Sequence, residues 1–165
     1  MLKGKIKNYN AEDYKIIKKK LLDRNFKIIE IDGAFINNEK DIFDIFSKKL
    51  KFPKYFGNNW DALRDMLEDL RWINVDKITV LINNFDSLIK KSFFGIFLEI
   101  LIESTNYWIL DKKEFTSIFF VSKNNLKIIS LINKKEKDFE IILKKNPDLF
   151  GYPFKNADKK LIKWI

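Results

Sequence analysis

Apolar and polar residues alternate with recognisable periods along the first part of the chain. Apolar side chains recur at helical spacing over residues 10–23, and Asn10 followed by Ala-Glu-Asp is typical of a helix start. The β-branched run Phe26–Ile31 stops at Asp32-Gly33, which predicts a strand followed by a turn. A second helix is expected over residues 38–50, with Asn38 as its N-cap and an apolar stripe along one face.

The pattern continues with a third helix over residues 60–71, for which Asn58 or Asn59 can serve as the N-cap. A nearly all-apolar run follows it, as expected for a strand that is covered on both faces. The elements expected from here on are a strand at Lys77–Ile82, a long helix over residues 87–103, a connection over residues 104–114 and a strand at Thr116–Val121.

Three strands separated by helices predict a small parallel sheet, because a helical crossover returns the chain in the same direction. We therefore expect an α/β fold in which one layer of helices packs on a three-stranded sheet. Further along the chain, the apolar run Leu126–Ile132 fits either a strand or a helix.

Two residue types are missing, and their absence restricts the possible chemistry. Without Cys there is no disulfide, thiolate metal site or cysteine nucleophile, and without His there is no imidazole base. We therefore expect neither an enzyme nor a bound cofactor. Residues 1–10 lack the apolar core of a secretory signal, and the apolar run Phe93–Ile102 is shorter than the roughly 20 residues that span a bilayer. A cytoplasmic protein without a membrane partner is expected.

The third predicted helix carries an unusual row of acids. At roughly 100° per residue, Asp61, Asp65, Glu68 and Asp69 fall on one face. Apolar residues occupy the opposite face, namely Trp60, Leu63, Met66, Leu67 and Leu70. Such a row is usually a solvated surface, but the preceding loop places two aromatic residues beside Gly57. Aromatic residues next to carboxylates on a loop held by a rigid helix favour a binding site.

The residues of this loop and helix also resemble a known family. The run Phe-Pro-Lys-Tyr-Phe-Gly-Asn-Asn-Trp-Asp-Ala-Leu-Arg-Asp-Met-Leu-Glu-Asp-Leu, at Phe52–Leu70, looks like the signature of the barstar family, the protein inhibitors of barnase-type ribonucleases. The resemblance implies a barstar-like fold, with a three-stranded parallel sheet packed against helices. We accordingly divide the chain into an N-terminal helical extension (1–25), a barstar-like domain (26–122) and a basic C-terminal extension (123–165).

In this family, the loop and acidic helix plug the cationic active site of the ribonuclease, with carboxylates where RNA phosphates would bind. The resemblance therefore implies a set of partner-binding residues. Those that match contact positions of the family motif are Tyr55, Gly57, Asn59, Asp61 and Asp65, together with Trp60, where tryptophan is usual in the family. Glu103, on the predicted long helix, is a further acidic candidate, and a solvated glutamate at a helix end is the alternative interpretation. Arg64 departs from the pattern, because the type member has an aromatic residue at this contact position. We therefore expect the partner to be a different toxin from the one that the type member binds.

The net charge of +9 is unevenly distributed along the chain. Residues 28–122 carry 12 basic and 15 acidic residues, whereas residues 1–27 carry 9 and 3, and residues 123–165 carry 11 and 5. The segment that resembles the family is therefore acidic, as a mimic of RNA should be. This predicts a cationic partner for that segment.

The hypothesis from the sequence is an intracellular immunity protein of a toxin–antitoxin pair, monomeric when free, with a ribonuclease as its partner. An alternative is a nucleic-acid-binding module on a barstar-like fold that uses the basic ends of the chain. Those ends contain Lys18-Lys19-Lys20, Lys134-Lys135, Lys144-Lys145 and Lys159-Lys160, with Trp164 nearby. A Mg²⁺-dependent enzyme is disfavoured, because the four helix carboxylates fan out along a face and do not converge.

Overall fold

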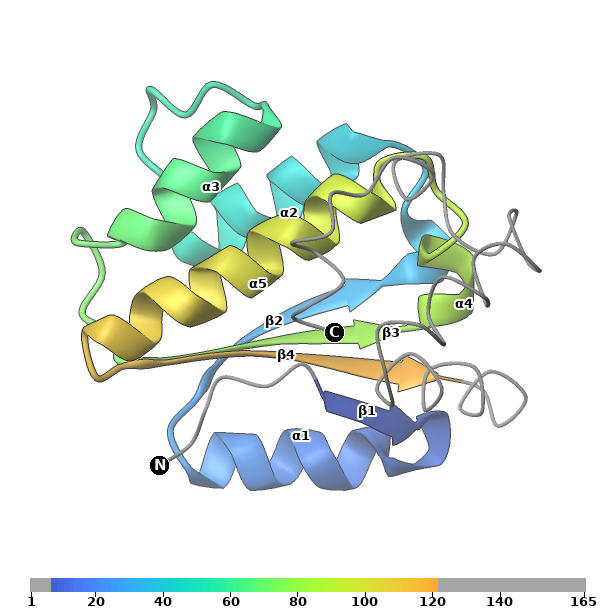
Figure 1. Ribbon diagram of the computed structural model, residues 1–165. Coiled ribbons are helices and arrows are strands. Elements are labelled where there is room, and N and C mark those ends of the chain that lie inside the picture. The colour runs from blue at the N-terminus through green and yellow to red at the C-terminus, as the bar shows by residue number, and fades with distance from the viewer. Residues whose placement is uncertain (1–6, 122–165) are drawn as a thin grey trace, which may run out of the picture.

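The computed structural model describes residues 7–121, with their side chains over residues 12–120, and contains one parallel sheet (Figure 1). The strand order is β1-β4-β3-β2, and every neighbouring pair is parallel. The strands are β1 (Lys7–Asn10), β2 (Lys27–Asp32), β3 (Lys77–Asn83) and β4 (Glu114–Val121). The three strands predicted from the sequence are confirmed, and β1 extends the sheet by pairing with β4.

Helices connect these strands, and three of them lie close to the predicted positions. They are α1 (Tyr14–Asp23), α2 (Glu39–Leu50), α3 (Trp60–Asp69), α4 (Phe85–Leu88) and α5 (Phe94–Leu110), with short 3₁₀ turns η1 (Ala11–Asp13) and η2 (Gly33–Phe35). Asn38 caps α2, as predicted, and forms a capping box with Asp41.

The prediction of one long helix over residues 87–103 is wrong. The chain forms the short α4, breaks, and then forms α5, which continues to Leu110 through residues that were predicted to be a connection. Ser104 and Thr105, which lie at the start of that stretch, are both buried, and the Thr105 hydroxyl donates to the carbonyl of Leu101 at 2.8 Å within the helix. Burial against the sheet and neighbouring helices outweighs the weak helix propensity of these residues.

Helices cover both faces of the sheet, which corrects the expected single layer of helices. Figure 1 shows α2, α3 and α5 on one face and α1 on the other. The larger core lies under α2, α3 and α5, and a smaller core under α1 contains Leu21, Phe26, Leu81, Ile118 and Phe120. Side chains of a strand alternate between faces, so Val80 and Ile82 enter the large core while Leu81 enters the small one.

Residues 7–25 are therefore packed onto the sheet through α1 and β1. The division of the chain at residue 25 stays a prediction. The segment 123–165, with the run Leu126–Ile132, lies outside the described residues. Within the described residues, every helix is too short or too polar to cross a membrane.

Two tryptophans donate hydrogen bonds to carbonyl groups near the ends of α2 and of the acidic helix α3. The indole Nε1 of Trp108, on α5, donates to the carbonyl of Leu67 near the end of α3 at 2.8 Å. The indole Nε1 of Trp72 donates to the carbonyl of Leu50 at the end of α2 at 3.0 Å. The last carbonyls of a helix lack partners within the helix, so each indole satisfies a group that would otherwise be left without one. The Trp108 bond fixes the end of α3 against α5, and the Trp72 bond holds the chain that follows α3 against the end of α2.

The Trp108 bond predicts a measurable effect on stability. We expect Trp108→Phe to lower the free energy of unfolding by about 1–3 kcal/mol, because the carbonyl of Leu67 stays buried without a donor. Urea denaturation measures the change. Tyr107→Phe is the matched control, because Tyr107 is the exposed neighbour on the same helix, and it should leave the midpoint nearly unchanged. Equal stability of the Trp108 variant and wild type would contradict the assignment.

Candidate functional site

The loop between α2 and α3 is anchored to the core by packed aromatic rings. Lys51 ends α2 in the left-handed conformation, with φ of 52°. Phe56 is buried, and its ring packs edge-on against Phe52 at 4.9 Å and against Phe43 at 6.2 Å between ring centroids. Tyr55 points outward and is 72% exposed. The loop therefore presents one aromatic side chain on a firmly packed base.

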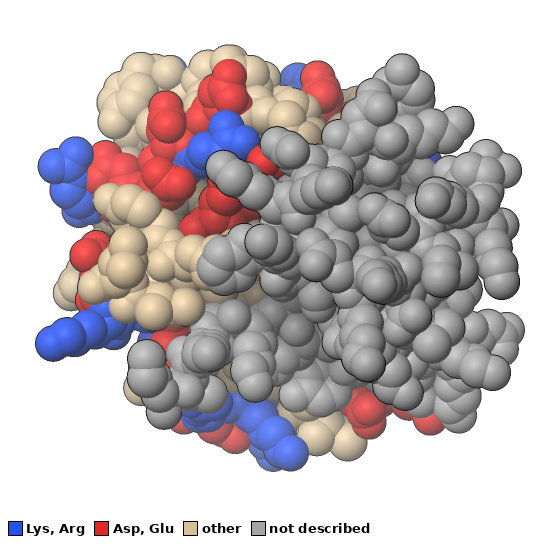
Figure 2. Space-filling model, viewed as in Figure 1, with Lys and Arg blue, Asp and Glu red and all other residues tan. Residues whose placement is uncertain are grey.

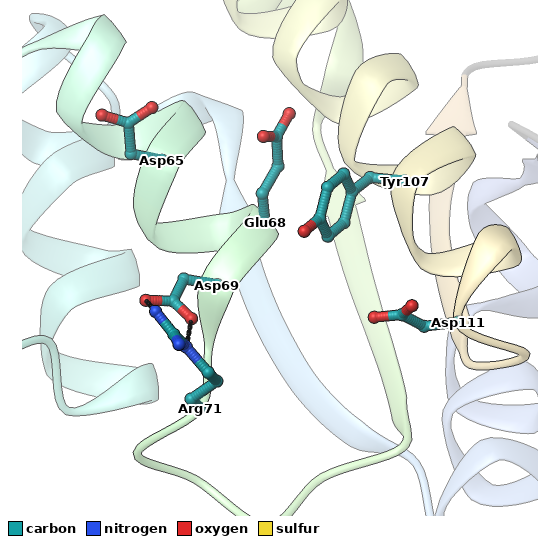
Figure 3. A pocket seen from close by; sticks show the side chains of 6 residues that line it. All are labelled: Asp65, Glu68, Asp69, Arg71, Tyr107 and Asp111. Atoms are coloured by element: carbon teal, nitrogen blue, oxygen red, sulfur yellow. Dashed lines mark hydrogen bonds and ion pairs between the residues drawn. The ribbon is translucent and has the colours of Figure 1, made fainter.

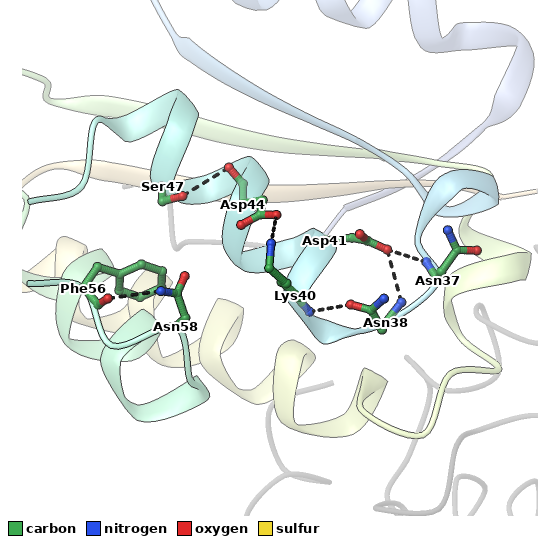
Figure 4. Close-up of polar contacts among 8 residues, drawn as sticks. All are labelled: Asn37, Asn38, Lys40, Asp41, Asp44, Ser47, Phe56 and Asn58. Atoms are coloured by element: carbon green, nitrogen blue, oxygen red, sulfur yellow. Dashed lines mark hydrogen bonds and ion pairs between the residues drawn. The ribbon is translucent and has the colours of Figure 1, made fainter. Parts of the chain in front are cut away.

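The end of this loop sets the start of α3. Of the two predicted N-cap candidates, Asn58 and Asn59, the N-cap is Asn59. Its Oδ1 accepts a hydrogen bond from the backbone N–H of Ala62 at 2.8 Å. Its Nδ2 donates to the carbonyl of Gly57 at 3.4 Å. Asn58 instead adopts a left-handed φ of 49°, and its Nδ2 donates to the carbonyl of Phe56 at 3.3 Å (Figure 4). Gly57 and Asn59 thus shape the backbone of the loop.

Contacts with α2 fix the first turn of α3. The indole Nε1 of Trp60 donates to Oε2 of Glu39 at 2.9 Å, and its ring lies 4.8 Å from that of Phe43 between centroids. Figure 4 shows the polar contacts that order the start of α2, where Asp41 accepts from the backbone of Asn37 and Asn38. Trp60 is half-buried and therefore joins two helices as well as reaching the surface.

The two faces of α3 are separated as the helical spacing predicts. The side chains of Leu63, Met66, Leu67 and Leu70 are buried. On the opposite face Asp61 and Asp65 are exposed, while Glu68 and Asp69 are half-buried. Figure 2 shows acidic side chains gathered over α3 and α5, with basic atoms among them. The acidic face is therefore composed of residues from two helices.

Arg64 lies between these helices and joins their carboxylates. Its Nε donates to Oε2 of Glu103, on α5, at 2.6 Å, and its Nη1 donates to Oδ1 of Asp61 at 3.0 Å. Burial disfavours the charged guanidinium, but the bond to Glu103 and the nearby carboxylates of Glu99 and Asp61 raise the pKa of Arg64 overall. The fold thus brings Glu103 to the acidic face, although it lies far from α3 in the sequence.

An open pocket of about 510 Å³ lies between the second half of α3 and the end of α5 (Figure 3). Tyr107 points from α5 into the space beside the end of α3, and Arg71 forms an ion pair with Asp69. The pocket is lined by Asp65, Glu68, Asp69, Arg71, Tyr107 and Asp111. Sequence reasoning missed Tyr107 and Asp111, because both lie in the stretch that was predicted to be a connection.

The carboxylates of this pocket have different environments. Burial raises the pKa of Glu68 above its ordinary value, and the charges of Glu103 and Asp65 raise it further. The hydrogen bond from Arg71 lowers the pKa of Asp69. In residues 12–120, no three acidic side chains are placed to hold a metal ion. The arrangement offers hydrogen-bond acceptors and negative potential to a cationic group.

Comparison with known proteins identifies the family. Residues 26–121 match the family described as Barstar (barnase inhibitor), and this match covers more than half of the chain. The chain belongs to the barstar family. One relative is "Putative ribonuclease inhibitor YrdF" of Bacillus subtilis (strain 168), which is 35% identical over 77 residues; these cover 47% of this chain and 78% of that protein. The resemblance seen at Phe52–Leu70 is thus confirmed at the level of the family.

The raised pKa of Glu68 predicts how stability depends on pH. The carboxyl group of Glu68 binds its proton more tightly in the folded protein than in the unfolded chain. At pH values above the folded-state pKa, the ionised carboxylate of Glu68 therefore destabilises the fold. We expect Glu68→Gln to have a higher free energy of unfolding than wild type at neutral pH. The difference should shrink as the pH falls through the raised pKa towards 4.5, the ordinary value.

Urea denaturation at neutral and acidic pH measures this difference. Asp23→Asn is the control for the change in net charge, because Asp23 is an exposed acid at the end of α1, on the opposite face of the sheet. It should not reproduce the gain at neutral pH. A Glu68→Gln variant less stable than wild type at neutral pH would show that the ionised carboxylate is favourable in the fold.

Proposed function

We propose that this barstar-family protein binds a barnase-type ribonuclease and blocks its cationic active site with the loop 52–59 and the acidic face of α3. In this role it is a cytoplasmic immunity protein of a toxin–antitoxin pair and has no catalytic activity of its own. Membership of an inhibitor family supports the class of function. The geometry of the loop and of α3 supports the surface through which it acts.

The single observation that carries the proposal is the exposed carboxylate of Asp65. It lies in the middle of α3, next to Arg64 in the sequence, and it lines the pocket. Within the described residues, no Lys or Arg forms an ion pair with Asp65, so both of its oxygens are available to a partner. A carboxylate accepts two parallel hydrogen bonds from an arginine, which makes it a substitute for an RNA phosphate.

The neighbouring residues have different roles in this interface. Tyr55 supplies an exposed aromatic side chain, the kind of residue that anchors protein interfaces. Gly57 leaves the loop backbone open, while Asn59 and Trp60 hold the start of α3 in place. Because these parts are already ordered in the free protein, binding loses less conformational entropy than it would for a mobile loop.

The test is inhibition of RNA cleavage by a candidate barnase-type ribonuclease, ideally the product of an adjacent gene. Wild type should form a complex and inhibit cleavage. We expect Asp65→Ala to weaken the complex by about 30-fold or more, because the cationic groups of the partner are left buried without a counter-charge. Asp23→Ala is the matched control, since it removes an exposed carboxylate on the far side of the sheet.

Co-expression gives the same comparison in cells, where Asp65→Ala should protect less than Asp23→Ala. Circular dichroism of each variant checks that the fold is intact. If Asp65→Ala inhibits and protects as well as wild type, the acidic face of α3 is not the binding surface. If wild type leaves the ribonuclease fully active, the protein is not its inhibitor.

A further inference from the structure

Arg64 is the only cation that α3 carries, and it stands in the middle of the surface proposed to meet a cationic enzyme. Its placement is well defined. The side chain is 27% exposed and is shared between two helices, with Asp61 three residues before it on α3 and Glu103 on α5. The planar guanidinium directs its donors in a fixed fork, so it can satisfy both carboxylates at once.

This arrangement removes two acceptors from the acidic face. Asp61 and Glu103 each have an oxygen engaged by Arg64, although their side chains are 89% and 41% exposed. A ribonuclease whose Arg or Lys side chains bind these two carboxylates has to displace Arg64. Its cationic groups are also repelled by the positive charge of Arg64. Asp65 has no such internal partner among the described residues, and neighbouring Glu68 has none either.

Arg71 provides a comparison within the same surface. It forms an ion pair with Asp69, two residues away, but its side chain is 87% exposed and lies beyond the end of α3. Such a local, solvated pair is weak and can open at little cost. The Arg64 contacts instead link two packed helices and are partly shielded from water. A partner would therefore displace Arg64 less easily than Arg71.

We propose that Arg64 is a specificity-determining residue, an inference that rests on the proposed function. By occupying Asp61 and Glu103 and presenting a positive charge, it disfavours ribonucleases whose cationic groups face these two carboxylates. The cognate enzyme presents a neutral or acceptor group opposite Arg64 and makes its main cationic contact with Asp65. Selectivity of this kind comes from a repulsive element as well as from attractive contacts.

The experiment uses the full chain, with barnase as the probe. Association and dissociation rates are measured at low and high salt for wild type, Arg64→Met, Arg64→Lys and Lys20→Met. We expect Arg64→Met to bind barnase about tenfold more tightly than wild type, mainly through faster association at low salt, because a like charge is removed and two carboxylates are released. Arg64→Lys keeps the charge and should bind barnase no more than about twofold more tightly than wild type.

Two control variants distinguish the local release of Asp61 and Glu103 from a change in net charge. Lys20→Met removes one positive charge from α1, an exposed site on the opposite face of the sheet, and should change the affinity by less than about twofold. Arg64→Met combined with Glu103→Gln should lose part of the gain, because one of the released carboxylates is then missing. Circular dichroism confirms that each variant is folded.

The proposal is overturned if Arg64→Met binds barnase no better than wild type, if neither forms a detectable complex, or if Lys20→Met gives the same gain. A loss of affinity in Arg64→Met would make Arg64 a favourable contact, which also overturns it. The proposed function is tested separately, with Asp65→Ala and the candidate ribonuclease, so a failure of the Arg64 proposal can be distinguished from a failure of the proposed function.

Discussion

The acidic helix α3 exposes its carboxylates on one face because its other face is packed against α5 and the core beneath it. A helix of ten residues is marginal in water, and like charges three or four residues apart weaken it further. Burial of Leu63, Met66 and Leu67 offsets this repulsion. The indole of Trp108, bonded to the carbonyl of Leu67, fixes where the helix ends. The position of every carboxylate on the face follows from this packing.

The same packing arranges the charges so that some are compensated and some are not. Arg64 ties Asp61 to Glu103 across the two helices, whereas Asp65 has no ion-pair partner among the described residues. Glu68, half-buried beside other acids, has its pKa raised by burial and by their charges. In the proposed function, a cationic partner would relieve the repulsion among these carboxylates. The negative potential of the acidic face would then favour association, and Arg64 would restrict which ribonucleases can bind there.

Local sequence patterns predicted most elements of the fold. The β-branched runs predicted β2, β3 and β4, and Asn38 and Asn59 mark helix starts through side-chain bonds that need only neighbouring residues. The prediction was wrong for α5, which continues to Leu110 through Ser104 and Thr105, two residues of weak helix propensity. Tertiary burial reversed that preference. The short strand β1 was also missed, since its pairing with β4 depends on backbone contacts distant in sequence.

The sequence by itself determined the family, through the run Phe52–Leu70, and the acidic face of α3, through its spacing of charged and apolar residues. Both are encoded within one continuous stretch, residues 52–70, and need no knowledge of distant residues. Only the tertiary structure decided that Arg64 pairs with Glu103, 39 residues away, and that Tyr107 and Asp111 complete a pocket with α3. Those contacts depend on how far α5 extends and how it lies against α3, which is set by packing of the shared core.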